Sequence, residues 1–131
     1  MDYGKNRTWL EVDLAVLREN YRKIQQRVSP AVGVMAVVKA DAYGLGAVKA
    51  TQALAAAGCR QFGTAYLEEA MELRENGIQA PVLVLGSVPL HQVEVAVEHR
   101  LTLQVSSLAM AAVFDQVAAR MGGTVGVRIG A

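Results

Sequence analysis

Cysteine, histidine and net charge are scarce in this sequence, and each scarcity argues against a class of protein. The single cysteine, Cys59, cannot form an internal disulfide, and its place after Gly58 at the start of an expected strand predicts buried packing rather than reactivity. His91 and His99 stand apart with no ligand cluster nearby, so no metal site is expected. The formal net charge of +1 gives no electrostatic basis for binding nucleic acid or an anionic membrane surface.

Long hydrophobic runs are also missing. No apolar stretch approaches the roughly 20 residues that span a bilayer. The opening residues MDYGKNRTWLEV lack the apolar core of a signal peptide, so a cytoplasmic location is expected. The 131 residues are 53% hydrophobic and 19% charged, which fits one ordered α/β domain with a real core.

Hydrophobic periodicity predicts strands and helices in regular alternation. A short strand-like segment, Arg7–Asp13, precedes a helix that Asp13 can cap and that Pro30 prevents from continuing. The expected strands that follow are 32–38, 61–65, 82–86, 102–105 and 124–129, and helices are expected over 47–57, 66–76, 89–98 and from Ser106 or Ser107 to 121. This alternation predicts parallel strands joined by right-handed helical crossovers, in either a flavodoxin-like open sheet or a barrel.

The stretch Ala31–Gly46, AVGVMAVVKADAYGLG, is the most informative part of the chain. Its unbroken apolar run up to Val38 predicts a strand buried on both faces. Lys39 follows at the carboxyl end of that strand, where ligands bind in α/β sheets and barrels. By position alone, a lysine at a strand end is usually solvated. The alternative is an amine in an apolar mouth, which loses its proton readily and can form a Schiff base.

The string VVKADAYGLG, residues 37–46, resembles the cofactor-lysine motif of the alanine racemases, usually seen as VKANAYGHG. It departs from the usual string at Asp41, where asparagine is common, and at Leu45, where histidine is common. Neither departure removes a group that the covalent chemistry needs. Residues 7–21, RTWLEVDLAVLRENY, and residues 62–86, FGTAYLEEAMELRENGIQAPVLVLG, resemble further segments of the same family.

This resemblance implies a site for pyridoxal phosphate. Lys39 falls on the residue that binds the cofactor as a Schiff base, and Tyr43 on the tyrosine that contacts its phosphate. Leu85 falls where the family has a residue packing close to the cofactor, although a core leucine is the simpler interpretation. Arg128, in VGVRIGA, could align with a lysine that is carbamylated in many members. An arginine keeps a positive charge but cannot be carbamylated, and it could equally be a surface residue.

The resemblance also implies an α/β fold, a parallel (β/α)₈ barrel of the TIM type. Such barrels need about 250 residues, so only about the first half is expected in this chain. Residues 14–131 would form the first β/α units of the cofactor-binding barrel. The N-terminal strand segment, residues 1–13, would pack with a C-terminal β-domain that lies outside this sequence.

The activity that the resemblance implies is interconversion of L- and D-alanine for cell-wall precursor supply. Two bases move the α-proton, Lys39 on one side and a tyrosine on the other, and that tyrosine belongs to a later part of the family's chain. We therefore expect this piece to be inactive alone and the complete chain to be a homodimer. The alternatives are a broader amino-acid racemase, a basic-amino-acid decarboxylase, a non-catalytic pyridoxal-phosphate carrier or homeostasis protein, and a truncated scaffold that binds nothing.

Overall fold

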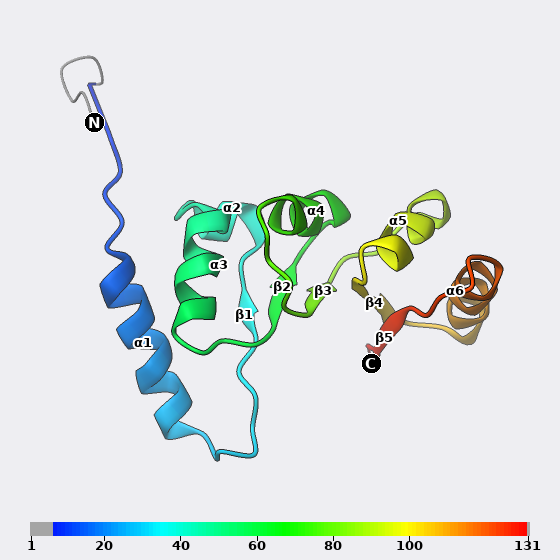
Figure 1. The fold of residues 1–131 in the computed structure, drawn as a ribbon, viewed down its shortest axis with the longest axis horizontal. Helices are drawn as coiled ribbons and strands as arrows, with labels where there is room; N and C mark the ends of the chain where they lie inside the picture. Colours follow the sequence, from blue (N-terminus) through cyan, green and yellow to red (C-terminus); the bar gives the residue numbers. More distant parts are fainter. Residues whose placement is uncertain (1–6, 131) are drawn as a thin grey trace.

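Five parallel strands form one sheet in this computed structural model, which describes residues 7–130. Helices α3 to α6 follow the strands along one side of the sheet, and α1 lies beyond α3 (Figure 1). The strands are β1 (Ala36–Val37), β2 (Phe62–Thr64), β3 (Val82–Val84), β4 (Thr102–Val105) and β5 (Gly126–Ile129). The helices are α1 (Leu14–Arg27), α2 (Lys39–Tyr43), α3 (Ala47–Ala56), α4 (Leu67–Glu75), the 3₁₀ turn η1 (Leu90–Gln92), α5 (Val93–Glu98) and α6 (Leu108–Arg120).

The strand order is β1-β2-β3-β4-β5, and every neighbouring pair is parallel. A flavodoxin-like sheet reverses direction at a switch point and has the order 2-1-3-4-5. An uninterrupted order that follows the chain is instead the order of a (β/α) barrel. The predicted α/β fold with parallel strands is therefore confirmed, and the structure represents part of such a barrel.

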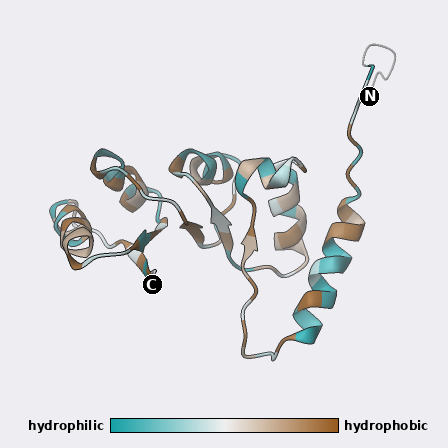
Figure 2. Ribbon diagram, turned by 180° about the vertical axis from the view of Figure 1, so that it is seen from behind, coloured by the Kyte–Doolittle hydropathy of each residue, from teal (hydrophilic) through white to brown (hydrophobic). Residues whose placement is uncertain are grey.

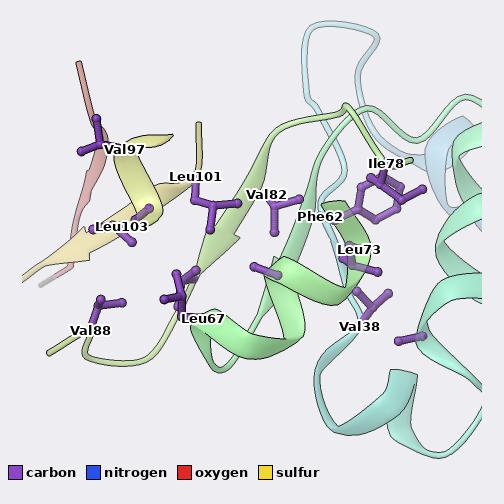
Figure 3. Packing of buried hydrophobic residues seen from close by; sticks show 14 of the residues in the cluster. Val38, Phe62, Leu67, Leu73, Ile78, Val82, Val88, Val97, Leu101 and Leu103 are labelled. Carbon is purple, nitrogen blue, oxygen red and sulfur yellow. The ribbon is translucent and has the colours of Figure 1, made fainter. Parts of the chain in front are cut away.

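The two faces of the sheet differ in what covers them. One row of paired residues runs across all five strands on the face away from the helices, namely Val37, Gly63, Leu83, Thr102 and Gly126. Alternate residues point the other way and meet the helices. The largest buried side chains there include Phe62, Leu73, Val82 and Leu103, each 0% exposed, and Figure 3 shows them extending in a row along the sheet. The core of the molecule is thus the layer between the sheet and its helices.

Local signals in the sequence place the helix ends. The Asp13 carboxylate accepts hydrogen bonds from the backbone N–H groups of Ala15 (2.9 Å) and Val16 (3.1 Å), as expected of an N-cap. Ser107 caps α6 in the same way, through a bond from Met110 N–H at 3.2 Å. The cap expected at Ser106 or Ser107 is therefore Ser107.

Strand β1 corrects one prediction. The expected strand over residues 32–38, buried on both faces, contains only two paired residues, and Val32 and Val37 are 49% and 37% exposed. β1 is an edge strand whose backbone pairs only with β2, and the exposure of its side chains depends on what covers the faces of the sheet. Among residues 7–130, no second sheet wall faces its inner side chains.

The N-terminal segment has no strand partner among the described residues. Residues 7–13 form no strand in the structure. A β-strand forms only where its backbone N–H and C=O groups can bond to a neighbouring strand, and no strand lies beside this segment among residues 7–130. Residues 1–6 lie outside the described residues, and the packing of residues 1–13 against a C-terminal β-domain stays a prediction.

Helix α1 packs on α3 with one side only. Tyr21 is its buried residue, whereas Val16 and Ile24 are 50% and 54% exposed. Figure 2 shows apolar and polar positions interspersed along this helix. None of the helices described over residues 7–130 is both long and apolar enough to cross a membrane.

At the amino-terminal edge of the sheet, Arg74 joins two loops. Its guanidinium donates hydrogen bonds to four backbone carbonyl oxygens, those of Ile78 (2.7 Å), Ala80 (2.8 Å), His99 (2.9 Å) and Arg100 (3.1 Å). Burial, and to a lesser degree the positive charge of Arg100, lower the pKa of Arg74. The side chain therefore binds the α4–β3 loop to the α5–β4 loop.

Cys59 lies beneath the start of β2. It is 3% exposed, and its thiol is 3.4 Å from the carbonyl oxygen of Gln61. The prediction of buried packing for this cysteine is confirmed.

Candidate functional site

The backbone after β1 takes an unusual path. Lys39 is exposed and begins the short helical turn α2, in which Ala40, Asp41, Ala42 and Tyr43 have φ angles of 52°, 54°, 53° and 57°. The connection between the expected strand over residues 32–38 and the expected helix over residues 47–57 is therefore a left-handed turn built from residues that are not glycine. Left-handed helical geometry costs L-residues roughly 1–2 kcal/mol each, so surrounding contacts must hold this turn in place.

Asp41 supplies one of those contacts. Its carboxylate accepts a hydrogen bond of 2.7 Å from the backbone N–H of Ala47, the first residue of α3. The N–H of Gly46 also bonds to the Asp41 carbonyl oxygen at 2.9 Å. Asp41 thus ties the left-handed turn to the start of the following helix, where a negative charge is favoured.

Glu69 supplies the other. One carboxylate oxygen accepts from the Ala40 N–H at 2.8 Å, and the second accepts from the N–H groups of Ala65 (2.7 Å) and Tyr66 (3.1 Å). From the sequence alone, Glu69 is expected in the first turn of the helix over residues 66–76, where a carboxylate is favoured by the helix dipole and faces solvent. Its first-turn position is confirmed. The assignment to solvent is wrong because Glu69 is half-buried and bonds to three backbone groups.

A signal for part of this role is present in the sequence. An acidic residue at the third position of a helix commonly reaches back to the N–H of the capping residue, here Tyr66. The bond to Ala40 spans 29 positions and has no local signature.

The predicted site residues lie at the end of the sheet where the carboxyl ends of the strands meet. Lys39 comes two residues after Val37, and Leu85 two residues after Leu83, both at the carboxyl ends of their strands. Arg128 in β5 is paired with Gln104 in β4 and is exposed. The fold therefore assembles residues that are far apart in the sequence at the edge where parallel sheets bind ligands.

Lys39 and Tyr43 both lie on the surface. Tyr43 is 64% exposed, and Lys39 is exposed as well, so the described residues do not enclose the amine in an apolar mouth. Leu85 is half-buried beside Gly63, where an added Cβ would lie 3.5 Å from the Leu85 Cδ1 and 3.4 Å from the Met35 Sδ. An added Cβ at Gly63 would therefore be in ordinary van der Waals contact with both side chains.

These groups fit the chemistry that pyridoxal phosphate requires. A reachable primary amine can bond covalently to its aldehyde carbon, a phenol hydroxyl can donate to a phosphate oxygen, and an apolar side chain can contact its ring. Within the described part of the chain, no three His, Cys, Asp or Glu side chains gather in a way that could hold a metal ion.

Two cavities lie at the opposite end of the strands, where the strands begin. One, of about 640 Å³, is lined by Arg74, Arg100 and residues that precede β3, β4 and β5. The other, of about 560 Å³, lies between α1 and the residues that precede β1 and β2. Neither is lined by Lys39, Tyr43 or Leu85.

Known proteins with similar sequences are alanine racemases. The chain is 41% identical to the alanine racemase of Synechocystis sp. over 119 residues. These aligned residues make up 90% of this chain and 32% of that protein. It is 43% identical over 96 residues to alanine racemase 1 of Bacillus subtilis, covering 73% of this chain and 25% of that protein. The chain therefore spans about a third or less of the length of these curated relatives.

Solved structures agree in fold. The alanine racemase of Clostridium difficile 630, in complex with cycloserine, superposes with a TM-score of 0.92 at 33% identity and covers 95% of this chain and 33% of that one. A histidine racemase from Leuconostoc mesenteroides superposes with a TM-score of 0.79 at 30% identity, covering 87% of this chain and 30% of that one.

The family profile described as the N-terminal domain of alanine racemase matches residues 12–130, which include the whole sheet and the Lys39 turn. The chain belongs to the alanine racemase family.

Proposed function

We propose that this chain provides the cofactor-lysine part of a pyridoxal-phosphate-dependent alanine racemase. The observation that carries the proposal is the position of Lys39, exposed at the carboxyl end of β1 within the family's motif. Family membership over residues 12–130 supports it. Because the chain spans about a third of its relatives, the activity belongs to a larger assembly of which these residues form one part.

Bound pyridoxal phosphate supplies an electron sink for negative charge at the substrate α-carbon. The Nζ atom of Lys39 would hold the cofactor covalently. When it is not bonded to the cofactor, the same Nζ atom would remove the α-proton, or return it, on one side of the substrate. Lys39 therefore has two successive roles, first as the covalent attachment point of the cofactor and then as a base.

The other two residues bind and orient. The hydroxyl of Tyr43 would donate to a phosphate oxygen, a role for which its exposed position four residues after Lys39 is suitable. The Leu85 side chain, which directly follows β3, would contact the cofactor ring. Neither residue transfers a proton.

The remaining parts of the proposal concern groups beyond this chain. A second base, a tyrosine, serves the opposite side of the substrate and comes from outside residues 1–131. Residues 14–131 form the first units of the barrel, and residues 1–13 pack with a C-terminal β-domain. The complete protein is a homodimer that makes D-alanine for cell-wall precursors in the cytoplasm.

A related substrate is the second candidate. The similarity to a histidine racemase favours amino-acid racemisation in general as the shared chemistry of this barrel. A decarboxylase on the same barrel and a non-catalytic cofactor carrier remain as alternatives, and substrate turnover by the complete protein distinguishes among them.

The decisive test is to trap the cofactor on its lysine. The complete gene product that contains these residues is mixed with pyridoxal phosphate, reduced with borohydride and digested for peptide mass mapping. We expect a visible absorption band before reduction and a single adduct on Lys39 after it. Lys39→Ala should lose both, together with racemisation. Lys49→Ala, an exposed lysine on α3, is the matched control and should change neither.

Retained alanine turnover in Lys39→Ala would contradict the assignment. An adduct scattered over several lysines in the wild-type protein would do the same, since it would show that Lys39 has no special reactivity.

A further inference from the structure

Glu69 makes more contacts than a helix cap needs. Its second oxygen already satisfies the Ala65 and Tyr66 N–H groups at the start of α4. Its first oxygen is used entirely outside the helix, in the 2.8 Å bond to the Ala40 N–H. The adjacent residue Glu68 is different, because it is exposed and bonds to the Gln92 side chain on η1.

The Ala40 N–H occupies a special place relative to Lys39. It lies in the peptide plane that joins these two residues, so holding it fixes the rotation about the Cα–C bond of Lys39. On the other side of Lys39, the peptide plane that joins it to Val38 is held through the Val38 carbonyl oxygen, which accepts a hydrogen bond from the Ala42 N–H at 3.0 Å. The peptide planes on both sides of Lys39 are therefore held, the preceding one by Ala42 of the turn and the following one by Glu69.

The conformation that follows Lys39 makes this anchor necessary. Ala40 is the first of four residues that are not glycine and that have positive φ. Without a bond to its N–H, this turn can relax towards the right-handed region, which L-residues prefer. Because the chain is held at Val38 before Lys39 and at Asp41 after it, such a change is absorbed by rotation about both backbone bonds of Lys39, and rotation about its N–Cα bond redirects the Cα–Cβ bond.

We propose that Glu69 is a positioning residue for Lys39, and that its carboxylate sets the direction in which the amine leaves the carboxyl end of β1. This inference rests on the proposed function, because it concerns the reactivity of Lys39 towards pyridoxal phosphate. It predicts that attachment at Lys39 depends on a carboxylate located on a different β/α unit.

Three variants test it in the complete gene product. Glu69→Ala removes both oxygens, and Glu69→Gln keeps one acceptor but turns an NH₂ group towards an N–H donor. Glu72→Ala, an exposed glutamate one turn further along α4, is the matched control. The rate of cofactor attachment is measured by borohydride trapping and mass mapping of Lys39. It is measured at a temperature where circular dichroism shows each variant folded.

We expect Glu69→Ala to attach the cofactor at Lys39 at least tenfold more slowly, Glu69→Gln to show a smaller loss and Glu72→Ala to match the wild type. Amide hydrogen exchange at Ala40, followed without cofactor, should accelerate in Glu69→Ala by a similar factor. If Glu69→Ala fails to fold, Glu69→Gln carries the test with the same two readouts.

A purely structural role gives a different pattern. Glu69→Ala would then melt at a lower temperature but, while folded, attach the cofactor as fast as the wild type, and this result overturns the positioning role alone. A wild-type protein that forms no adduct on Lys39 overturns the proposed function and the positioning role together. The two failures are thereby distinguished.

Discussion

Replacing Arg74 with alanine should destabilise the fold more than any other change to a charged residue. The guanidinium donates to the carbonyl oxygens of Ile78, Ala80, His99 and Arg100, in two separate loops. Alanine leaves all four without this donor. Lysine does not substitute, because one ammonium group has three donors and lacks the planar fork that reaches both loops.

The expected size follows from these bonds. A hydrogen bond to a charged group contributes about 1.5–3 kcal/mol. Water can replace part of each bond since the Arg74 side chain is only half-buried, and the lowered pKa shows that its charge is partly disfavoured there. We therefore take about 1 kcal/mol for each bond, a total of about 3–4 kcal/mol. Single domains are stable by about 5–15 kcal/mol, so the loss is large.

Urea unfolding followed by circular dichroism measures this change. With a slope near 1.5–2 kcal/mol per molar urea, the midpoint should fall by about 2 M. Arg120→Ala is the control, because Arg120 is exposed and forms one ion pair, with Glu94. An exposed pair of this kind contributes about 1 kcal/mol or less. If the two variants differed by less than about 0.5 kcal/mol, the four-carbonyl junction would not stabilise the fold as described.

Three further predictions concern substitutions that remove one functional group from a side chain. Tyr43→Phe should weaken cofactor retention, measured by dialysis and absorbance, with little change in melting temperature, because the lost hydroxyl is on a 64% exposed residue. Asp41→Ala should lower the free energy of unfolding by about 1 kcal/mol, and Asp41→Asn should restore most of it, because the Ala47 N–H needs only an oxygen acceptor. Burial, and less so the nearby Cys59, raise the pKa of Tyr21, so folding keeps the phenol neutral above pH 10, where it ionises in the unfolded chain. Stability should therefore fall as the pH rises above 10, and it should fall less in Tyr21→Phe; equal losses in the two proteins would contradict this.

The alternation of strands and helices was predictable because its signals are local. Strand β4 was expected over residues 102–105 and forms over Thr102–Val105. Asp13 and Ser107 cap the helices that they were expected to cap. In each case the deciding interaction lies within a few residues, where periodicity and capping preferences operate.

The turn after Lys39 was not predictable by those means. Every residue from Ala40 to Tyr43 disfavours a positive φ on its own, so local preference indicates a different conformation. The turn exists because Asp41 and Glu69 bond to backbone N–H groups around it. One of those bonds reaches a residue 29 positions away, which no local pattern records.

The burial of the β1 side chains could not be predicted from the sequence for a related reason. An apolar run without alternation indicates a strand that can be buried on both faces. Whether it is buried depends on what lies opposite, and Val37 remains 37% exposed in the described part of the chain. The assignments of Lys39, Tyr43 and Leu85 came from resemblance to a family, and the fold adds that they share one edge of the sheet.

The strand order also determines how the chain can fold during synthesis. Each strand pairs with the one that precedes it in the sequence, from β1 to β5. No strand has to wait for a later segment to be inserted between it and its predecessor. As the polypeptide leaves the ribosome, every new β/α unit therefore meets a template that has already emerged. The strand order thus allows the sheet to grow from the N-terminus one strand at a time, with β1 as the first template, whereas the Lys39 turn is completed only when α4 supplies Glu69.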